Sequence, residues 1–180
     1  MPDNVIPILI TPETVKERSA VHSNVDNKLI LPEIYAMQSL YIMPLLGSKL
    51  YKKILEDIKS NSLEGKYKEL HESYLIDIMT NYVVSELYDV MNYQFWNTGV
   101  KTNTQQETST PNYSEITGLK TKHKIRAEFF ADQCRRYLKQ YASEFFPEYL
   151  DAQEVSGLAP DIKSYSCPIY LGGRGDTDCG

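Results

Sequence analysis

The sequence predicts an all-α fold: a helical bundle with two long antiparallel helices, short N-terminal helices, a long polar loop and an extended C-terminal tail. Three observations lead to this prediction. Apolar residues recur at steps of three and four over residues 73–93, which places them on one face of a helix. Residues 119–146 show the same period, and residues 97–118 between them are polar and show none.

The N-terminal part of the chain predicts short helices in succession. Residues 1–10 are expected to be extended, and Thr11 followed by proline and glutamate is typical of a helix start. We expect the second helix to begin around Pro32, in its first turn, and to end at Pro44. The residue before a proline is pushed out of the helical conformation. Ser48 is the expected N-cap of the third helix.

The two long helices are predicted from their apolar stripes. A short charged helix from Lys66 towards His71 precedes the first long helix. The first stripe consists of Leu75, Ile78, Met79, Tyr82, Val83, Leu87, Val90 and Met91. The second consists of Ile125, Phe129, Phe130, Cys134, Tyr137, Leu138, Tyr141 and Phe145, and Pro147 marks the end of that helix or a kink.

The chain divides into a helical domain over residues 1–150, with the polar loop 97–118, and a tail over 151–180. Five of the nine glycines lie in the tail, which shows no helical period. Residues 164–171 have a short β-like character that Pro168 limits to an edge or added strand. We expect the tail to pair with the sheet edge of a partner protein, anchored by Tyr165, Ile169, Tyr170 and Leu171.

Composition narrows the function classes. The formal net charge of −5 is mild, so overall charge does not indicate nucleic-acid binding. No apolar run approaches the roughly 20 residues of a membrane span, and an N-terminus without a basic region predicts no signal peptide. Three scattered cysteines predict neither a disulfide framework nor a CxxC metal site, and favour folding in a reducing cytoplasm.

The sequence contains no motif that points to catalysis. It has no GxSxG, HExxH or phosphate-binding P-loop pattern. His22, His71 and His123 lie far apart without neighbours at metal-ligand spacing, so each is expected at the surface. We therefore expect no enzyme activity, no metal and no cofactor. The 14 tyrosines fit either surfaces that meet partners or the edges of amphipathic helices.

A basic cluster marks the start of the second long helix. It could contact phosphate, face water, or pair with acidic residues such as Glu64, Glu69 and Glu72 of a neighbouring subunit. A DNA-reading helix normally follows a short turn, whereas a long polar loop precedes this one. This argues against a sequence-specific DNA reader. The candidate interface residues here are Lys120, Lys122, Lys124 and Arg126.

The order of elements, with PEIYAMQSLYIMPLLGSKLY before the first long helix, resembles the head–tail connector proteins of tailed bacteriophages, also called adaptor or head-completion proteins. The resemblance covers residues 11–150, and the sequence also resembles proteins of the crAss-like phage group. One position departs from the pattern, because Gln38 stands one residue beyond the usual Ala-Gln pair. The matching positions are Ala36, Gln38, Leu46, Gly47, Leu50 and Tyr51.

This resemblance implies a structural virion protein at the portal vertex. It would be made in the host cytoplasm and would form a ring, typically of about twelve copies, by head-to-tail contacts. Its partners would be the portal protein and a tail or neighbouring ring, with double-stranded DNA passing through without sequence-specific binding. Two alternatives remain open: a small all-helical DNA-binding protein using residues 120–126, and an enzyme or inhibitor domain whose site the sequence does not reveal.

Overall fold

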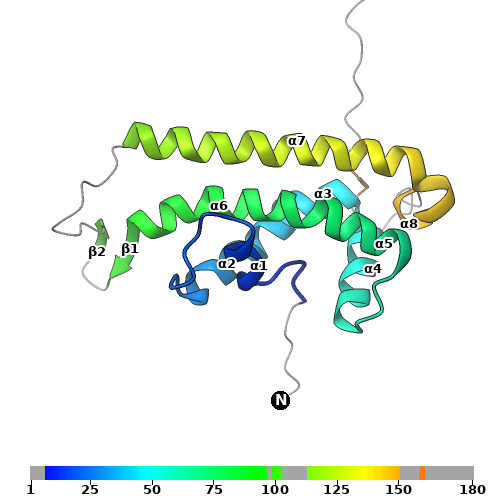
Figure 1. The fold of residues 1–180 in the computed structure, drawn as a ribbon, viewed down its shortest axis with the longest axis horizontal. Helices are drawn as coiled ribbons and strands as arrows, with labels where there is room; N and C mark the ends of the chain where they lie inside the picture. The colour runs from blue at the N-terminus through cyan, green and yellow to red at the C-terminus, as the bar shows by residue number, and fades with distance from the viewer. Residues whose placement is uncertain (1–6, 97–98, 103–112, 151–158, 161–180) are drawn as a thin grey trace, which may run out of the picture.

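Two long antiparallel helices, α6 (Ile76–Asn92) and α7 (Tyr113–Phe145), form the framework of the molecule (Figure 1). This computed structural model describes residues 7–96, 99–102, 113–150 and 159–160. Most of the described residues are helical, which confirms the all-α fold class. A two-stranded antiparallel hairpin, β1 (Tyr93–Trp96) and β2 (Gly99–Thr102), extends α6 into the first part of the predicted polar loop.

Shorter helices pack along one side of the long pair. α2 lies across α6, while α4, α5 and α8 close the end that is remote from the hairpin (Figure 1). Their bounds are α1 (Pro12–Glu17), α2 (Asn27–Met37), the π-helical turn η1 (Gln38–Ile42), α3 (Met43–Leu46), α4 (Ser48–Lys59), α5 (Gly65–Leu70), the π-helical turn η2 (His71–Leu75) and α8 (Pro147–Leu150).

The first helix has the predicted start. Thr11 is the N-cap of α1, and its hydroxyl oxygen accepts a hydrogen bond from the Thr14 backbone N–H at 3.2 Å. Pro12 occupies the first position, where the missing N–H costs nothing because that donor has no partner within the helix.

The predicted limits of the second helix are wrong at both ends. α2 begins at Asn27, because the Asp26 carboxylate caps it by accepting from the Lys28 backbone N–H at 2.9 Å. Pro32 therefore lies inside the helix. Pro44 does not end the helical path, since η1 carries it into α3 and places Pro44 in a first turn, where no donor is needed.

The helical path ends instead at Gly47, which has a φ of 76°. Gly47 is also the N-cap of α4, so Ser48 is the first helical residue rather than the predicted cap. A Cβ on Gly47 would lie 2.9 Å from Cδ of Pro160, so both backbone conformation and close approach favour glycine here. Pro160, one of the two tail residues that the structure describes, is buried against this bend.

Both π-helical turns fix the segment that precedes α1. Gln38, in η1, is buried; its Oε1 accepts from the Leu9 backbone N–H and its Nε2 donates to the Pro7 carbonyl, each at 3.2 Å. His71, in η2, donates from Nε2 to the Leu9 carbonyl at 2.7 Å. His71 was expected at the surface, but it is half-buried because the N-terminal segment covers it.

α7 begins at Tyr113, six residues before the predicted start at 119, and ends as predicted before Pro147. Its buried face differs from the predicted stripe. Ile125 and Phe129 are 61% and 58% exposed, and smaller side chains face α6 in their place. The buried residues of α7 are Ile116, Ala127, Ala131, Cys134, Tyr137, Leu138 and Ala142.

Most of the predicted stripe of the first long helix is confirmed. Its buried members are Leu75, Ile78, Met79, Tyr82, Val83 and Leu87, whereas Val90 is half-buried and Met91 is 41% exposed.

By length and composition the stretch Asn27–Leu46 could cross a membrane. It is near the N-terminus and contributes Ile30, Ile34 and Ile42 to the core, and the core helix of a soluble protein passes the same test.

Candidate functional site

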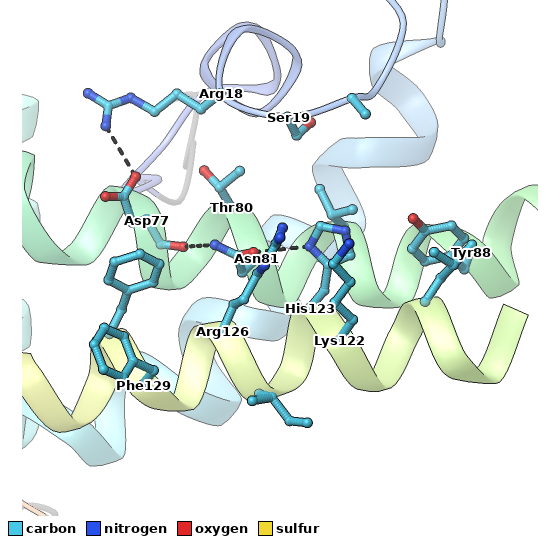
Figure 2. A pocket seen from close by; sticks show the side chains of 15 residues that line it. Arg18, Ser19, Asp77, Thr80, Asn81, Tyr88, Lys122, His123, Arg126 and Phe129 are labelled. Atoms are coloured by element: carbon cyan, nitrogen blue, oxygen red, sulfur yellow. Dashed lines mark hydrogen bonds and ion pairs between the residues drawn. The ribbon is translucent and has the colours of Figure 1, made fainter.

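A groove of about 920 Å³ opens between α6, α7 and the chain that follows α1 (Figure 2). We call it the α7 groove. α6 and α7 form its long walls, and the short segment after α1 closes the third side. Its lining residues are Arg18, Ser19, Ala20, Asp77, Thr80, Asn81, Val84, Tyr88, Leu119, Lys122, His123, Ile125, Arg126, Phe129 and Phe130.

The groove carries an excess of positive charge. Lys122 and Arg126 are exposed on α7, and no ion pair within the described residues involves either of them. Arg18, which caps the end of α1, forms an ion pair with Asp77 of α6 at 3.2 Å between Nη1 and Oδ1. Asp77 is the single carboxylate among the lining residues, so an acidic ligand would meet a net positive wall.

Large apolar side chains stand beside these cations. Ile125 and Phe129 are mostly exposed, and Leu119 is 39% exposed. The Phe129 ring packs edge-on against Phe130, with 5.7 Å between ring centroids. Apolar side chains that are left in water beside arginine are typical of surfaces that bind another protein.

A polar network lies at the base of the groove (Figure 2). Asn81 donates from Nδ2 to the Asp77 carbonyl at 2.8 Å, so its Oδ1 faces Nδ1 of His123, 3.0 Å away. Nδ1 of His123 therefore carries the proton that makes this hydrogen bond. Burial lowers the pKa of His123 below its ordinary value, and the nearby charges of Arg126 and Lys122 lower it further, so this imidazole is neutral at pH 7.

Thr80 adds an unsatisfied group to the same wall. Its hydroxyl is buried and has no hydrogen-bond partner within the described residues. Figure 2 shows Thr80 on the side of α6 that faces the segment containing Ser19. A buried hydroxyl without a partner costs free energy, so this position would gain from a polar group brought by a ligand.

The structure separates the four basic residues that the sequence brought together. Lys124 pairs with Glu86 of α6 at 3.0 Å, while Lys120 pairs with Asp89 and lies 3.9 Å from Glu86. Lys122 and Arg126 lie on the groove side instead. Helical geometry explains the split, because residues two apart on a helix point about 200° apart around its axis.

Within one chain the cluster meets carboxylates other than Glu64, Glu69 and Glu72, and pairing with those residues of a neighbouring subunit stays a prediction. Glu69 pairs with Lys66 at 2.8 Å, and Glu72 with Lys68 at 3.8 Å, both within α5 and η2. The carboxylates that meet Lys120 and Lys124 come from α6 of the same chain. The other predicted interface residues, Tyr165, Ile169, Tyr170 and Leu171, lie outside the described residues.

Sequence reasoning missed Arg18 and the outward direction of Ile125 and Phe129. The available signal was that the stretch 119–146 contains too many apolar residues for one narrow stripe.

Within the described residues no group of three or more histidine, cysteine or acidic side chains could hold a metal ion. Burial raises the pKa of the Cys134 thiol to about 12, so this cysteine stays protonated and unreactive.

The fold and the groove define an all-α bundle whose most distinctive surface is suited to binding. Residues 42–157 match a family described as "Family of unknown function (DUF6712)", and the chain belongs to this family. The match includes the α6 and α7 walls of the groove but not the segment after α1. Neither the curated proteins nor the solved structures gave a match.

Proposed function

We propose that this protein is a structural subunit of the phage portal vertex, where it forms a ring that joins head to tail and continues the DNA channel. The proposal rests on the resemblance of residues 11–150 to head–tail connector proteins. The single structural observation that supports it is the exposed apolar face of α7, formed by Leu119, Ile125 and Phe129 beside Lys122 and Arg126.

An exposed apolar face of this kind suits a subunit better than a solitary protein. Isolated apolar side chains are common at protein surfaces, whereas a contiguous set beside a groove marks an interaction site. Burying such side chains against a neighbour stabilises the assembly by roughly 25 cal/mol per Å² of apolar surface removed from water. Copies arranged head to tail around an axis would bury this face once per subunit.

The main alternative, a small DNA-binding protein using residues 120–126, receives less support from the same surface. Lys120 and Lys124 are neutralised by Glu86 and Asp89, which leaves Lys122 and Arg126 of the predicted cluster to meet phosphate. Non-specific DNA affinity grows with the number of phosphates neutralised. We therefore expect weak DNA binding with a shallow salt dependence.

Native mass spectrometry and electron microscopy of the protein, alone and mixed with the portal protein of its own phage, test the proposal. We expect a ring of about twelve copies on the portal, and a monomer or partial ring without it. The matched control is a portal from an unrelated phage, which should recruit no ring. A two-fold dimer that ignores both portals would overturn the proposal.

The predicted role of the C-terminal tail remains part of this proposal. Removing residues 161–180 keeps Pro160, which packs at Gly47, and so should leave the melting temperature of the bundle unchanged. Attachment to the neighbouring ring should be lost. The prediction is contradicted if the truncated protein attaches normally.

A further inference from the structure

A second exposed surface lies on the opposite flank of α7, and we call it the Leu40 ridge: Glu33, Leu40, Glu128 and Asp132. Leu40, on the π-helical turn η1, is 62% exposed, although it is a large apolar side chain. A hollow of about 100 Å³ joins Leu40 to Tyr82 on α6 and Arg135 on α7.

The ridge carries the opposite charge from the groove. Glu128 is exposed, and Asp132 pairs with Arg135 at 2.6 Å. Glu128 lies one turn before Asp132 on α7, so the two carboxylates share one face of that helix. Burial, and to a smaller extent the charge of Glu128, raises the pKa of Tyr82 to about 12. On this flank the carboxylates of Glu33, Glu86, Asp89, Glu128 and Asp132 outnumber the cations Lys120, Lys124 and Arg135.

Repulsion between the ridge and carboxylates of α6 shows in Glu33. Burial raises the pKa of this half-buried carboxyl, and the charges of Glu86 and Asp89 raise it further. A cation brought by a neighbouring molecule would favour the ionised form and offset that repulsion. The ridge thus combines an exposed apolar side chain with an excess of negative charge.

The two surfaces point in different directions from one helix. Arg126 lines the α7 groove and Glu128 belongs to the ridge, and residues two apart point about 200° apart around a helix. One copy therefore presents basic side chains on one flank of α7 and an acidic ridge on the other, with Ile125 and Phe129 between them, since each lies three residues before a ridge carboxylate. Surfaces arranged in this way can meet head to tail in successive copies but cannot satisfy one another within a single chain.

We propose that the α7 groove of one copy receives the Leu40 ridge of the next copy. Leu40 would pack against Ile125 and Phe129, while Lys122 and Arg126 would face Glu128, beside the Asp132–Arg135 ion pair. This inference rests on the proposed ring, and it names the two surfaces that make the contact between neighbours. Charge complementarity identifies the occupant as a second copy, because both halves of the contact are exposed on the same molecule.

Disulfide trapping between two differently tagged variants tests the contact. One copy carries Leu40→Cys and the other Phe129→Cys, both with Cys167→Ser and Cys179→Ser, while the buried and unreactive Cys134 is kept. Both altered positions are exposed, so the bundle should fold normally, and a melting curve checks this. We expect the mixed disulfide to exceed either homodimer several-fold.

Lys52→Cys replaces Leu40→Cys in the matched control, since Lys52 is an exposed residue of α4 outside both surfaces. It should give no preference for the mixed disulfide. A predominance of Phe129→Cys or Leu40→Cys homodimers would indicate a two-fold contact and overturn the inference. Equal trapping by the control would also overturn it, because the disulfide would then report only random collision.

Charge reversal provides a second, independent readout. Arg126→Glu in the Phe129→Cys copy should reduce the mixed disulfide several-fold, and Glu128→Arg in the Leu40→Cys copy should restore it. If Arg126→Glu reduced the mixed disulfide by damaging the fold of its own chain, Glu128→Arg in the other chain would not restore it. If the pair of reversals traps no better than Arg126→Glu alone, the proposed alignment of groove and ridge is wrong.

Trapping on the assembled portal separates this inference from the proposed function. A ring that forms without the mixed disulfide leaves the function in place and overturns the groove–ridge contact. A mixed disulfide that forms in solution, together with failure of every portal to recruit the protein, leaves the contact in place and overturns the portal function.

Discussion

The two halves of α7 use their apolar residues in opposite ways. In residues 113–130 the buried side chains are Ile116 and Ala127, while Ile125 and Phe129 face water. In residues 131–145 the large side chains Tyr137 and Leu138 are buried, and Phe146, directly after the helix, is fully buried.

The contacts that hold each half differ accordingly. Ion pairs and a hydrogen bond join the first half to α6, through Lys120, Lys124 and His123. Aromatic rings dominate the second half, where Tyr137 packs against Tyr74, with 4.9 Å between ring centroids. The second half therefore stabilises the bundle, and the first half keeps its apolar residues available for a partner.

The largest expected difference in stability is between two variants that each lose one aromatic ring, one in the buried part of the molecule and one in the exposed first half of α7. Phe146 is fully buried and packs edge-on against Tyr67, with 5.2 Å between ring centroids. Phe146→Ala should lower the free energy of unfolding by about 3–5 kcal/mol, because it leaves a cavity that the core cannot fill. The matched variant Phe129→Ala should change it by no more than about 0.5 kcal/mol.

Urea unfolding followed by circular dichroism measures both changes. Equal losses for Phe146→Ala and Phe129→Ala would show that the first half of α7 also belongs to the core, and the comparison would fail.

A smaller effect is expected from enlarging Ala127, a small buried side chain of the first half. Ala127 is fully buried between α6 and α7, so Ala127→Leu should overpack this contact and destabilise the protein by about 1–3 kcal/mol. Thr121→Leu, at an exposed position of the same half, is the control and should stay within about 0.5 kcal/mol. Unchanged stability of Ala127→Leu in the same unfolding assay would mean that the helices do not approach closely here.

The smallest expected effect concerns pH and is confined to the first half, since His123 is its only histidine and the second half has none. Folding lowers the pKa of His123 below its ordinary value of 6.5, so the unfolded chain binds a proton more readily than the folded one. The contribution of His123 to the free energy of unfolding is therefore fully present above pH 6.5. It declines as the pH falls through that value towards the folded pKa.

Unfolding curves between pH 7.5 and 5 measure this decline. His123→Gln should flatten it, and Arg126→Gln should reduce it, because Arg126 is the second cause of the lowered pKa. A decline that is as steep in His123→Gln as in the unaltered protein would assign the pH dependence to other groups.

Local sequence signals determined the elements whose limits depend on local chemistry. The start of α1 at Thr11–Pro12 and the end of α7 before Pro147 could be predicted because caps and prolines act within one helical turn. The apolar period predicted two long helices, and the burial of Cys134 followed from its place on the second stripe.

Tertiary contacts decided the rest. Pro32 lies inside α2 because that helix begins at Asn27, and Pro44 is accommodated because η1 joins α2 to α3. This π-helical turn also places Gln38 against the N-terminal segment. The basic cluster was recognised from the sequence, but its division between ion pairs and groove depends on the position of Glu86 on α6.

Which side chains line the α7 groove depends mainly on how α7 is rotated about its own axis. Spacing alone shows that a helix has an apolar face, whereas the neighbouring helix selects which residues are buried. Ala127 and Ala131 face α6 and allow the two backbones to approach closely, so the bulkier Ile125 and Phe129 are left on the outside. The sequence determined that the apolar residues exist, and close packing of α6 on α7 decided which of them remain free to bind.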